Sequence, residues 1–169
     1  MENPAQALEH DWHSVGGSNF HFQFTPKYRR KVFRDEHLRE CCKELAYQKA
    51  AELGIVIEAM EYGPDHVHLF TRGCRNYSVA QLAQYFKGYI SREIRKREPE
   101  RVNRHLSGAP FWSAGYFYES VGRVTSETVR YYIARQQKKH WAPGEYGVPG
   151  SQPAPAARGQ LTLDRFAAG

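Results

Sequence analysis

Apolar and polar residues alternate along residues 19–25, which is the pattern of a strand that buries one of its faces. Pro26 ends the alternation, and a short basic turn follows. From Leu38 to Leu53 the apolar residues recur at helical spacing, and Gly54 directly after them is a typical helix stop. The pattern therefore predicts a strand followed by a helix.

The next two segments predict a β-hairpin. Residues 55–62 are rich in apolar and β-branched side chains, and residues 66–72 form a second strand-like run. Gly63, Pro64 and Asp65 between them are typical turn residues.

A second helix is predicted after the hairpin. Ser78 is a suitable N-cap, and apolar residues from Val79 to Ile94 form a stripe at helical spacing, with Pro99 beyond its end. Residues 99–114 have no clear period, so we expect a loop there.

The aromatic residues 115–121 predict a fourth strand, and Thr125 or Ser126 caps a last helix that runs to about Lys139. The order is strand, helix, strand, strand, helix, strand, helix. The first six elements match the ferredoxin-like split βαβ arrangement (βαββαβ), an α+β fold with an antiparallel sheet and helices on one face. The last helix is an addition to that fold.

Composition divides the chain into three parts. Residues 142–169 contain four Pro, five Gly and six Ala, and such a stretch buries too little apolar surface to offset its ordering entropy. We therefore expect an extended tail there, a loose arm over residues 1–16, and one folded domain over residues 17–141.

The formal net charge of +6 is concentrated in that domain. Residues 1–16 carry −3 and residues 142–169 carry no net charge, so residues 17–141 hold +9. Because phosphates attract cations and unpaired bases stack on flat rings, this charge and the 14% of aromatic residues favour a nucleic-acid partner. A basic soluble domain without such a partner is the alternative that charge alone leaves open.

Other features of composition exclude two classes of protein. No run of 18 apolar residues exists, which excludes a membrane span, and residues 1–13 lack the pattern of a secretory signal. Cys41, Cys42 and Cys74 have no paired spacing, which suits a reduced cytoplasm better than a disulfide scaffold. We therefore expect a cytoplasmic protein.

His66 and His68 form the sharpest local feature. Residues i and i+2 of a strand point to the same face, so both imidazoles project together while Val67 and Leu69 face the helices. Two such imidazoles can ligate one divalent metal, and Asp65 could orient a ring. An arbitrary His-x-His pair is more often two strand histidines bonded to backbone or solvent, so that alternative stays open.

The last predicted helix offers further donors. Tyr132 and Gln136 are i and i+4, so they share one helix face. Gln136 could present its amide oxygen to a cation, and Tyr132 could act beside it as a nucleophile. Tyr131 and Gln137 are neighbouring candidates, and a pair of tyrosines on a helix is otherwise typical of amphipathic packing.

Taken in order, several motifs resemble the single-domain transposases of the IS200/IS605 insertion-sequence family, which are HUH-type single-strand nucleases with one catalytic tyrosine. The resemblance spans about residues 18–139, nearly the whole predicted domain. Its segments are Thr25-Pro26-Lys27-Tyr28-Arg29, Asp65-His66-Val67-His68-Leu69, Lys87-Gly88, Phe111-Trp112-Ser113-Ala114-Gly115-Tyr116-Phe117 and Tyr132-Ile133-Ala134-Arg135-Gln136.

The resemblance implies a role for each matching residue. His66 and His68 would be metal ligands, Gln136 the third protein ligand and Tyr132 the nucleophile, while Tyr131 lies one position off the motif. The implied reaction is a metal-assisted transesterification through a 5′-phosphotyrosine that leaves a free 3′-hydroxyl. Mg²⁺ is the expected ion, with Mn²⁺ tolerated, and no nucleotide cofactor is needed because the bond energy is kept.

The resemblance also implies partners: single-stranded DNA with hairpin ends, a second copy of the chain in a homodimer, no membrane, and a place on the nucleoid when DNA is bound. Two basic clusters are candidate DNA contacts, with a solvated charged face as the alternative for each. They are Lys27, Arg29, Arg30 and Lys31 after the first strand, and Arg92, Arg95, Lys96 and Arg97 at the end of the second helix.

Three functions are compatible with the sequence. The first is a single-strand DNA transposase. The second is a domesticated relative that keeps the nuclease chemistry, acting as a nickase or on repeated palindromes. The third is a non-enzymatic ferredoxin-like module that binds nucleic acid, in which His66 and His68 are incidental.

Overall fold

The computed structural model describes residues 8–137, with the backbone alone at residues 9–11 and 135–137. Its centre is a four-stranded antiparallel sheet in the order β4-β5-β3-β6. The strands are β3 (Asn19–Phe24), β4 (Val56–Gly63), β5 (His66–Arg72) and β6 (Phe117–Val121). The predicted ferredoxin-like α+β fold is confirmed, with β3 and β5 as the central strands.

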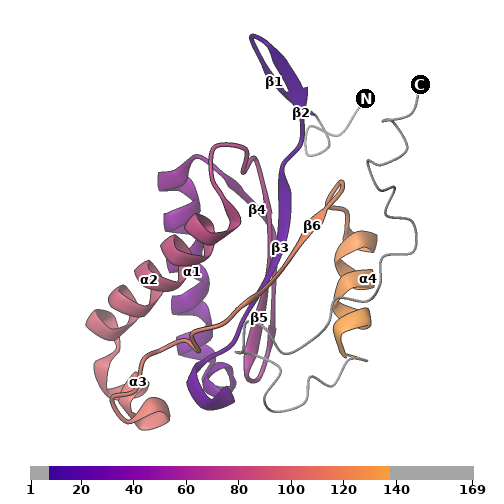
Figure 1. Ribbon diagram of the computed structural model, residues 1–169. Coiled ribbons are helices and arrows are strands. Elements are labelled where there is room, and N and C mark those ends of the chain that lie inside the picture. Colours follow the sequence, from indigo (N-terminus) through magenta and orange to yellow (C-terminus); the bar gives the residue numbers. More distant parts are fainter. Residues whose placement is uncertain (1–7, 138–169) are drawn as a thin grey trace, which may run out of the picture.

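Two helices cover one face of this sheet (Figure 1). They are α1 (Glu36–Leu53) and α2 (Val79–Arg97), which pack side by side. The core between helices and sheet is apolar, and it includes Phe22 and Leu69 from the strands and Phe86 from α2. Burying one such side chain stabilises the fold by about 1.5–3 kcal/mol. This face of the sheet is therefore committed to the core, and the opposite face is left for function.

The ends of these helices form as the sequence predicts. Gly54 ends α1 with a φ of 69°, the left-handed conformation that favours glycine. Ser78 begins α2 with a capping box: its hydroxyl accepts from the Gln81 backbone N–H, and the Gln81 side chain accepts from the Ser78 N–H.

The expected loop over residues 99–114 is wrong in its first half. A short helix, α3 (Pro99–Leu106), forms there with Pro99 in its first turn. Val102 and Leu106, which are i and i+4, bury its inner face. Two apolar positions in so short a stretch do not show a helical period, and the sequence pattern therefore missed this helix.

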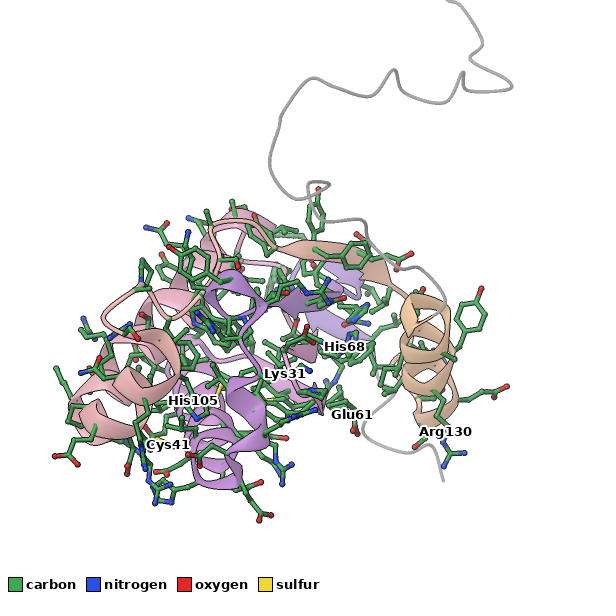
Figure 2. All side chains as sticks on the ribbon, turned by 90° about the horizontal axis from the view of Figure 1, so that it is seen from below. Lys31, Cys41, Glu61, His68, His105 and Arg130 are labelled. Carbon is green, nitrogen blue, oxygen red and sulfur yellow. The ribbon has the colours of Figure 1, made fainter. Side chains whose placement is uncertain are left out.

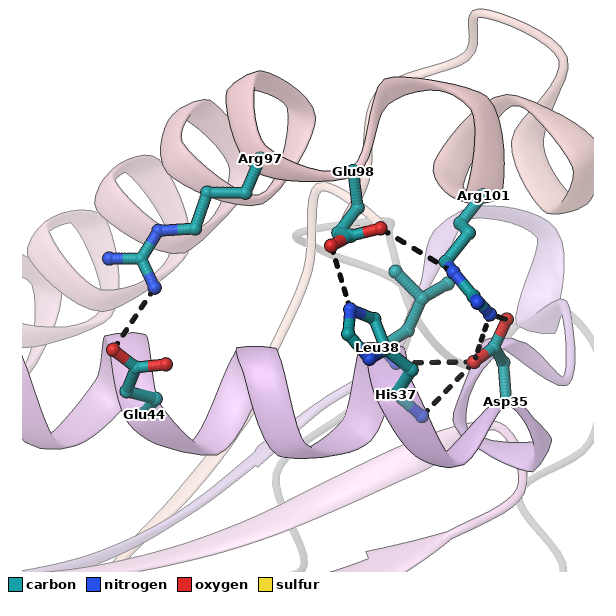
Figure 3. Close-up of polar contacts among 7 residues, drawn as sticks. All are labelled: Asp35, His37, Leu38, Glu44, Arg97, Glu98 and Arg101. Carbon is teal, nitrogen blue, oxygen red and sulfur yellow. Dashed lines mark hydrogen bonds and ion pairs between the residues drawn. The ribbon is translucent and has the colours of Figure 1, made fainter.

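A charge network ties the start of α1 to α3 (Figure 3). Asp35 caps α1 by accepting from the N–H groups of His37 and Leu38, and its carboxylate also accepts from Arg101 at 3.2 Å. Glu98 accepts from the His37 ring at 2.7 Å and lies 3.5 Å from Arg101. Although burial acts to raise it, the bond from the Leu38 N–H and the Arg101 guanidinium hold the pKa of Asp35 below its ordinary value.

The fourth strand is shorter than predicted. It begins at Phe117 because Lys87 of α2 engages the backbone carbonyls of the residues before it. The Lys87 ammonium donates to the carbonyls of Ser113, Ala114 and Gly115 at 2.8, 2.9 and 3.2 Å. Burial lowers the pKa of Lys87 to about 8. Carbonyls that are turned toward this side chain are not available to a neighbouring strand.

The expected loose arm contains regular structure. β1 (Glu9–Asp11) and β2 (Ser14–Gly16) form an antiparallel hairpin that extends past the end of the main sheet (Figure 1). The predicted tail over residues 142–169 lies outside the described residues, so the domain boundary at residue 141 stays a prediction. Among residues 8–137, no helix has the length and apolar character that crossing a bilayer requires.

Candidate functional site

A fourth helix, α4 (Ser126–Gln137), lies on the face of the sheet opposite to α1 and α2 (Figure 1). Its Val129 is almost fully buried, and the ring centroid of Tyr132 lies 5.7 Å from that of His21 and 6.4 Å from that of Phe70. The Tyr131 side chain, in contrast, is 60% exposed. Of the two tyrosines, Tyr132 is therefore the one that faces the sheet.

The two predicted metal ligands lie on the sheet face that α4 covers. The ring centroids of His66 and His68 are 5.0 Å apart and their planes are nearly perpendicular, at 82°. Val67 and Leu69 point the other way, into the core with α1 and α2, as the period of two predicts. Figure 2 shows His68 on the side of the sheet that faces α4.

The ring of His66 is oriented by its neighbour in sequence. Its Nδ1 donates to Oδ1 of Asp65 at 2.8 Å, and Oδ2 of the same carboxylate accepts from Nε of Arg29 at 3.1 Å. Burial acts to raise the pKa of Asp65, but the bonds from His66 and Arg29 outweigh it and hold that pKa below its ordinary value. An ionised Asp65 keeps the proton on Nδ1 of His66 and leaves the Nε2 lone pair for a ligand role.

The turn that carries Arg29 has an unusual backbone conformation and is held in place by hydrogen bonds. Tyr28 and Arg29 have φ values of 58° and 51°, a left-handed conformation that costs non-glycine residues energy. The turn is held against a distant motif, because the Lys27 N–H donates to the Phe111 carbonyl and the Ser113 hydroxyl donates to the Pro26 carbonyl. Two motifs far apart in the sequence thus form one support beside Asp65.

The ring of His68 is held by a residue that the sequence analysis did not single out. Its Nδ1 lies 3.0 Å from Nε2 of His21, and both side chains are buried. Burial, together with the nearby His21 and His66, lowers the pKa of His68 to about 3, so the ring is neutral at neutral pH as a metal ligand must be. The available signal was the alternation in residues 19–25, which places His21 on the same face as His68.

This donor set fits a divalent cation. Both Nδ1 atoms are engaged, by Asp65 and His21, so Nε2 is the nitrogen through which His66 and His68 could each bind a cation. The predicted third ligand, Gln136, lies one turn after Tyr132 on α4, and its side chain is outside the described atoms. Over residues 8–137, no group of three or more His, Cys, Asp or Glu side chains could hold a metal. A cation here would need an oxygen donor such as the Gln136 amide or the substrate.

The structure separates the predicted DNA-contacting cations into two kinds. Arg29 is bonded to Asp65, and Arg95 donates to the Ala109 carbonyl, so both have a place within the fold. Lys27 lies over the ring of its neighbour Tyr28, and Arg92 is bonded to Glu93 while its side chain stays 65% exposed. Lys96 pairs with Glu93, and Arg97 pairs with Glu44. The last two members of the set, Arg30 and Lys31, are exposed.

Comparison with known proteins gives consistent results. The family model described as "Transposase IS200 like" matches residues 14–136. This chain is 27% identical over 120 residues to the ISDra2 transposase TnpA of Deinococcus radiodurans, covering 71% of this chain and 84% of that protein. It is 26% identical over 140 residues to the transposase for insertion sequence element IS200 of Salmonella typhimurium, covering 81% and 88%. A crystal structure of a candidate transposase from D. radiodurans R1 matches with a TM-score of 0.56 and 23% identity over 76% of this chain and 98% of that one, which bears on the fold alone.

Proposed function

Because this chain belongs to the IS200-like transposase family, whose model matches residues 14–136, we propose that it cleaves and rejoins single-stranded DNA at the ends of an insertion sequence. The observation that carries the proposal is that His66 and His68 lie on the sheet face toward which the Tyr132 ring points. Two imidazoles whose Nδ1 atoms are held by Asp65 and His21 lie on that face, and α4 brings a tyrosine ring near it.

Tyr132 is the proposed nucleophile. Its phenolic oxygen attacks the scissile phosphorus in line, so that an Oη–P bond forms while the P–O3′ bond breaks. The phenol gives up its proton and the leaving O3′ gains one, which yields a free 3′-hydroxyl and a 5′-phosphotyrosine. Attack by another 3′-hydroxyl reverses the step and joins new ends, and no ATP is consumed.

The chain's own residues prepare this step by fixing geometry. The ring of Tyr132 lies close to the rings of His21 and Phe70, which limits where its hydroxyl can point. Asp65 and His21 hold the two imidazoles whose Nε2 atoms, with the amide of Gln136, are the proposed ligands of Mg²⁺ or Mn²⁺. Such a cation, when bound, polarises the scissile phosphate and stabilises the charge that develops on it.

The proposed substrate is single-stranded DNA with hairpin ends. Three exposed cations are suited to the phosphate backbone: Arg30 and Lys31, which follow Arg29 in the chain, and Arg92 on α2. Residues 8–137 carry one such face, so we propose a homodimer that handles two DNA ends together, in the cytoplasm and on the nucleoid.

A covalent-adduct assay tests the proposal. Wild-type protein, labelled single-stranded DNA carrying the cognate end, and Mg²⁺ or Mn²⁺ should give a protein–DNA adduct that survives denaturation. Tyr132→Phe should abolish the adduct, while Tyr131→Phe, the matched control, should keep it. Adduct formation by Tyr132→Phe would show that the nucleophile is wrong, and its absence in the wild type with every cognate end would contradict the enzyme and leave the non-enzymatic module.

The alternative function, a domesticated nickase, would use the same catalytic residues. The DNA around the gene distinguishes it from a transposase. Short imperfect palindromes in the DNA on both sides of the gene support the mobile element. Their absence, with matching palindromes repeated elsewhere in the genome, supports the domesticated relative.

A further inference from the structure

We propose that His21 is a positioning residue that fixes the ring of His68 and keeps a proton on its Nδ1, so that Nε2 of His68 presents its lone pair to the cation. This inference rests on the metal role of His68 in the proposed function. It adds a residue from β3 to a site that otherwise comes from β5 and α4.

The position of the His21 ring is set by the sheet. His21 stands directly opposite Phe70 in the antiparallel register of β3 and β5, and the two rings stack with centroids 4.3 Å apart and planes 3° from parallel. The His21 side chain is wholly buried. A buried ring that stacks on its neighbour in a central strand has little freedom to rotate. The Nε2 of His21 is therefore held within hydrogen-bond distance of Nδ1 of His68.

The direction of the hydrogen bond decides what His68 can do. The bond between Nε2 of His21 and Nδ1 of His68 is 3.0 Å long and holds one proton. If that proton belonged to His21, the neutral His68 ring would carry its own proton on Nε2 and would have no lone pair to offer there. If it belongs to His68, Nε2 of His68 is a ligand and His21 is the acceptor. Metal binding therefore requires the second arrangement.

The two imidazoles of the site thus have two different acceptors. The carboxylate of Asp65 accepts from His66, and in the proposed arrangement the imidazole of His21 accepts from His68. His21 also lies 5.7 Å from the Tyr132 ring, centroid to centroid. A change at His21 is therefore expected to affect mainly the proposed ligand His68, and to a smaller extent the position of the proposed nucleophile Tyr132.

Two variants separate the acceptor from the packing. His21→Phe keeps a ring to stack on Phe70 but removes the acceptor, whereas His21→Gln can place an amide oxygen near the position of Nε2. Binding of Mn²⁺ to the full chain without DNA, measured by electron paramagnetic resonance of free Mn²⁺, should be about 10–100-fold weaker in His21→Phe. His21→Gln should recover most of the affinity.

His66→Ala provides the reference for this measurement. If the wild type binds no Mn²⁺, or binds it as well as His66→Ala does, the proposed metal site is wrong and the role of His21 falls with it. If His66→Ala loses binding but His21→Phe keeps the wild-type affinity, the metal site stands and the inference about His21 is overturned. Equal loss in His21→Phe and His21→Gln would overturn the acceptor role.

A measurement on the unaltered protein covers the case in which a variant does not fold. Nitrogen-15 spectra of the histidine rings report which ring nitrogen carries the proton. His68 should show a protonated Nδ1 and an unprotonated Nε2 at neutral pH. The opposite tautomer of His68 would overturn the proposal.

Discussion

Gly63, the last residue of β4, leaves the space in which the His66 ring lies. A Cβ at this position would stand 2.2 Å from Cε1 and 2.6 Å from Nε2 of His66, closer than any real contact. From the sequence, Gly63 could be identified only as a turn residue before Pro64. The local sequence does not show that the His66 ring packs against this glycine. The constraint belongs to the fold and not to the local pattern.

Gly63→Ala is therefore expected to displace the His66 ring from its place beside Asp65. Single-strand DNA cleavage should fall by about 10-fold or more, as for other losses of ligand orientation. Gly88→Ala in α2 is the matched control, because no atom lies within 4 Å of its Cβ. That change should raise the free energy of unfolding by up to about 1 kcal/mol and leave cleavage unchanged. Wild-type cleavage by Gly63→Ala would show that the ring is not needed where it lies.

Whether a residue of the site could be predicted depends on how far away in the sequence its partner lies. The shared face of His66 and His68 follows from the period of two, and Asp65 is adjacent, so both could be predicted. His21 could not, because its bond to His68 depends on the register between β3 and β5 and on burial under α4. Arg29 was assigned to DNA by its charge, whereas its hydrogen bond is to Asp65.

Among the elements, those with a long apolar stripe and a cap were predicted well. α1 and α2 have both, and their ends match the expected Gly54 and Ser78. α3 has neither a long stripe nor a side-chain cap, and it is held by packing and by the pair between Arg101 and Asp35. Short elements that tertiary contacts stabilise leave little periodic trace in the sequence.

The network at the start of α1 predicts a pH dependence of stability. The pKa of Asp35 is lowered in the folded state, so its ionised form adds stability that is complete above the unfolded pKa of about 3.9. That stability is lost as the pH falls through the lower folded value. Asp35→Asn keeps an N-cap but not the charge, so it should cost about 1 kcal/mol near neutrality and progressively less below about pH 4. Urea unfolding of both proteins from pH 7 to pH 3 measures the difference, and a constant difference would contradict the role of the charge.

On the scale of the whole molecule, the order of elements was enough to predict the sheet and the layer of α1 and α2. The placement of α4 was not predictable in the same way, because an amphipathic helix does not say which surface it will cover. Its position brings Tyr132 near His21 of β3 and Phe70 of β5, on the face where His21 and His68 are buried. The site is therefore a product of tertiary packing on a predictable fold.

The structure also shows which cations of the +9 domain, residues 17–141, are paired and which are exposed. Several cations of this domain are paired with carboxylates within the fold, such as Arg29 with Asp65 and Arg97 with Glu44 (Figure 3). The cations that stay exposed, such as Arg30 and Lys31, are those left to attract a phosphate backbone. Net charge thus indicates the class of partner, whereas the residues that contact it stay a prediction.

In the proposed reaction a single residue, Tyr132, carries the DNA. Mass spectrometry of the wild-type adduct, digested with a protease and a nuclease, identifies the modified side chain directly. We expect a nucleotide joined through its 5′-phosphate to Tyr132. A nucleotide on Tyr131 or on any other residue would contradict the proposal.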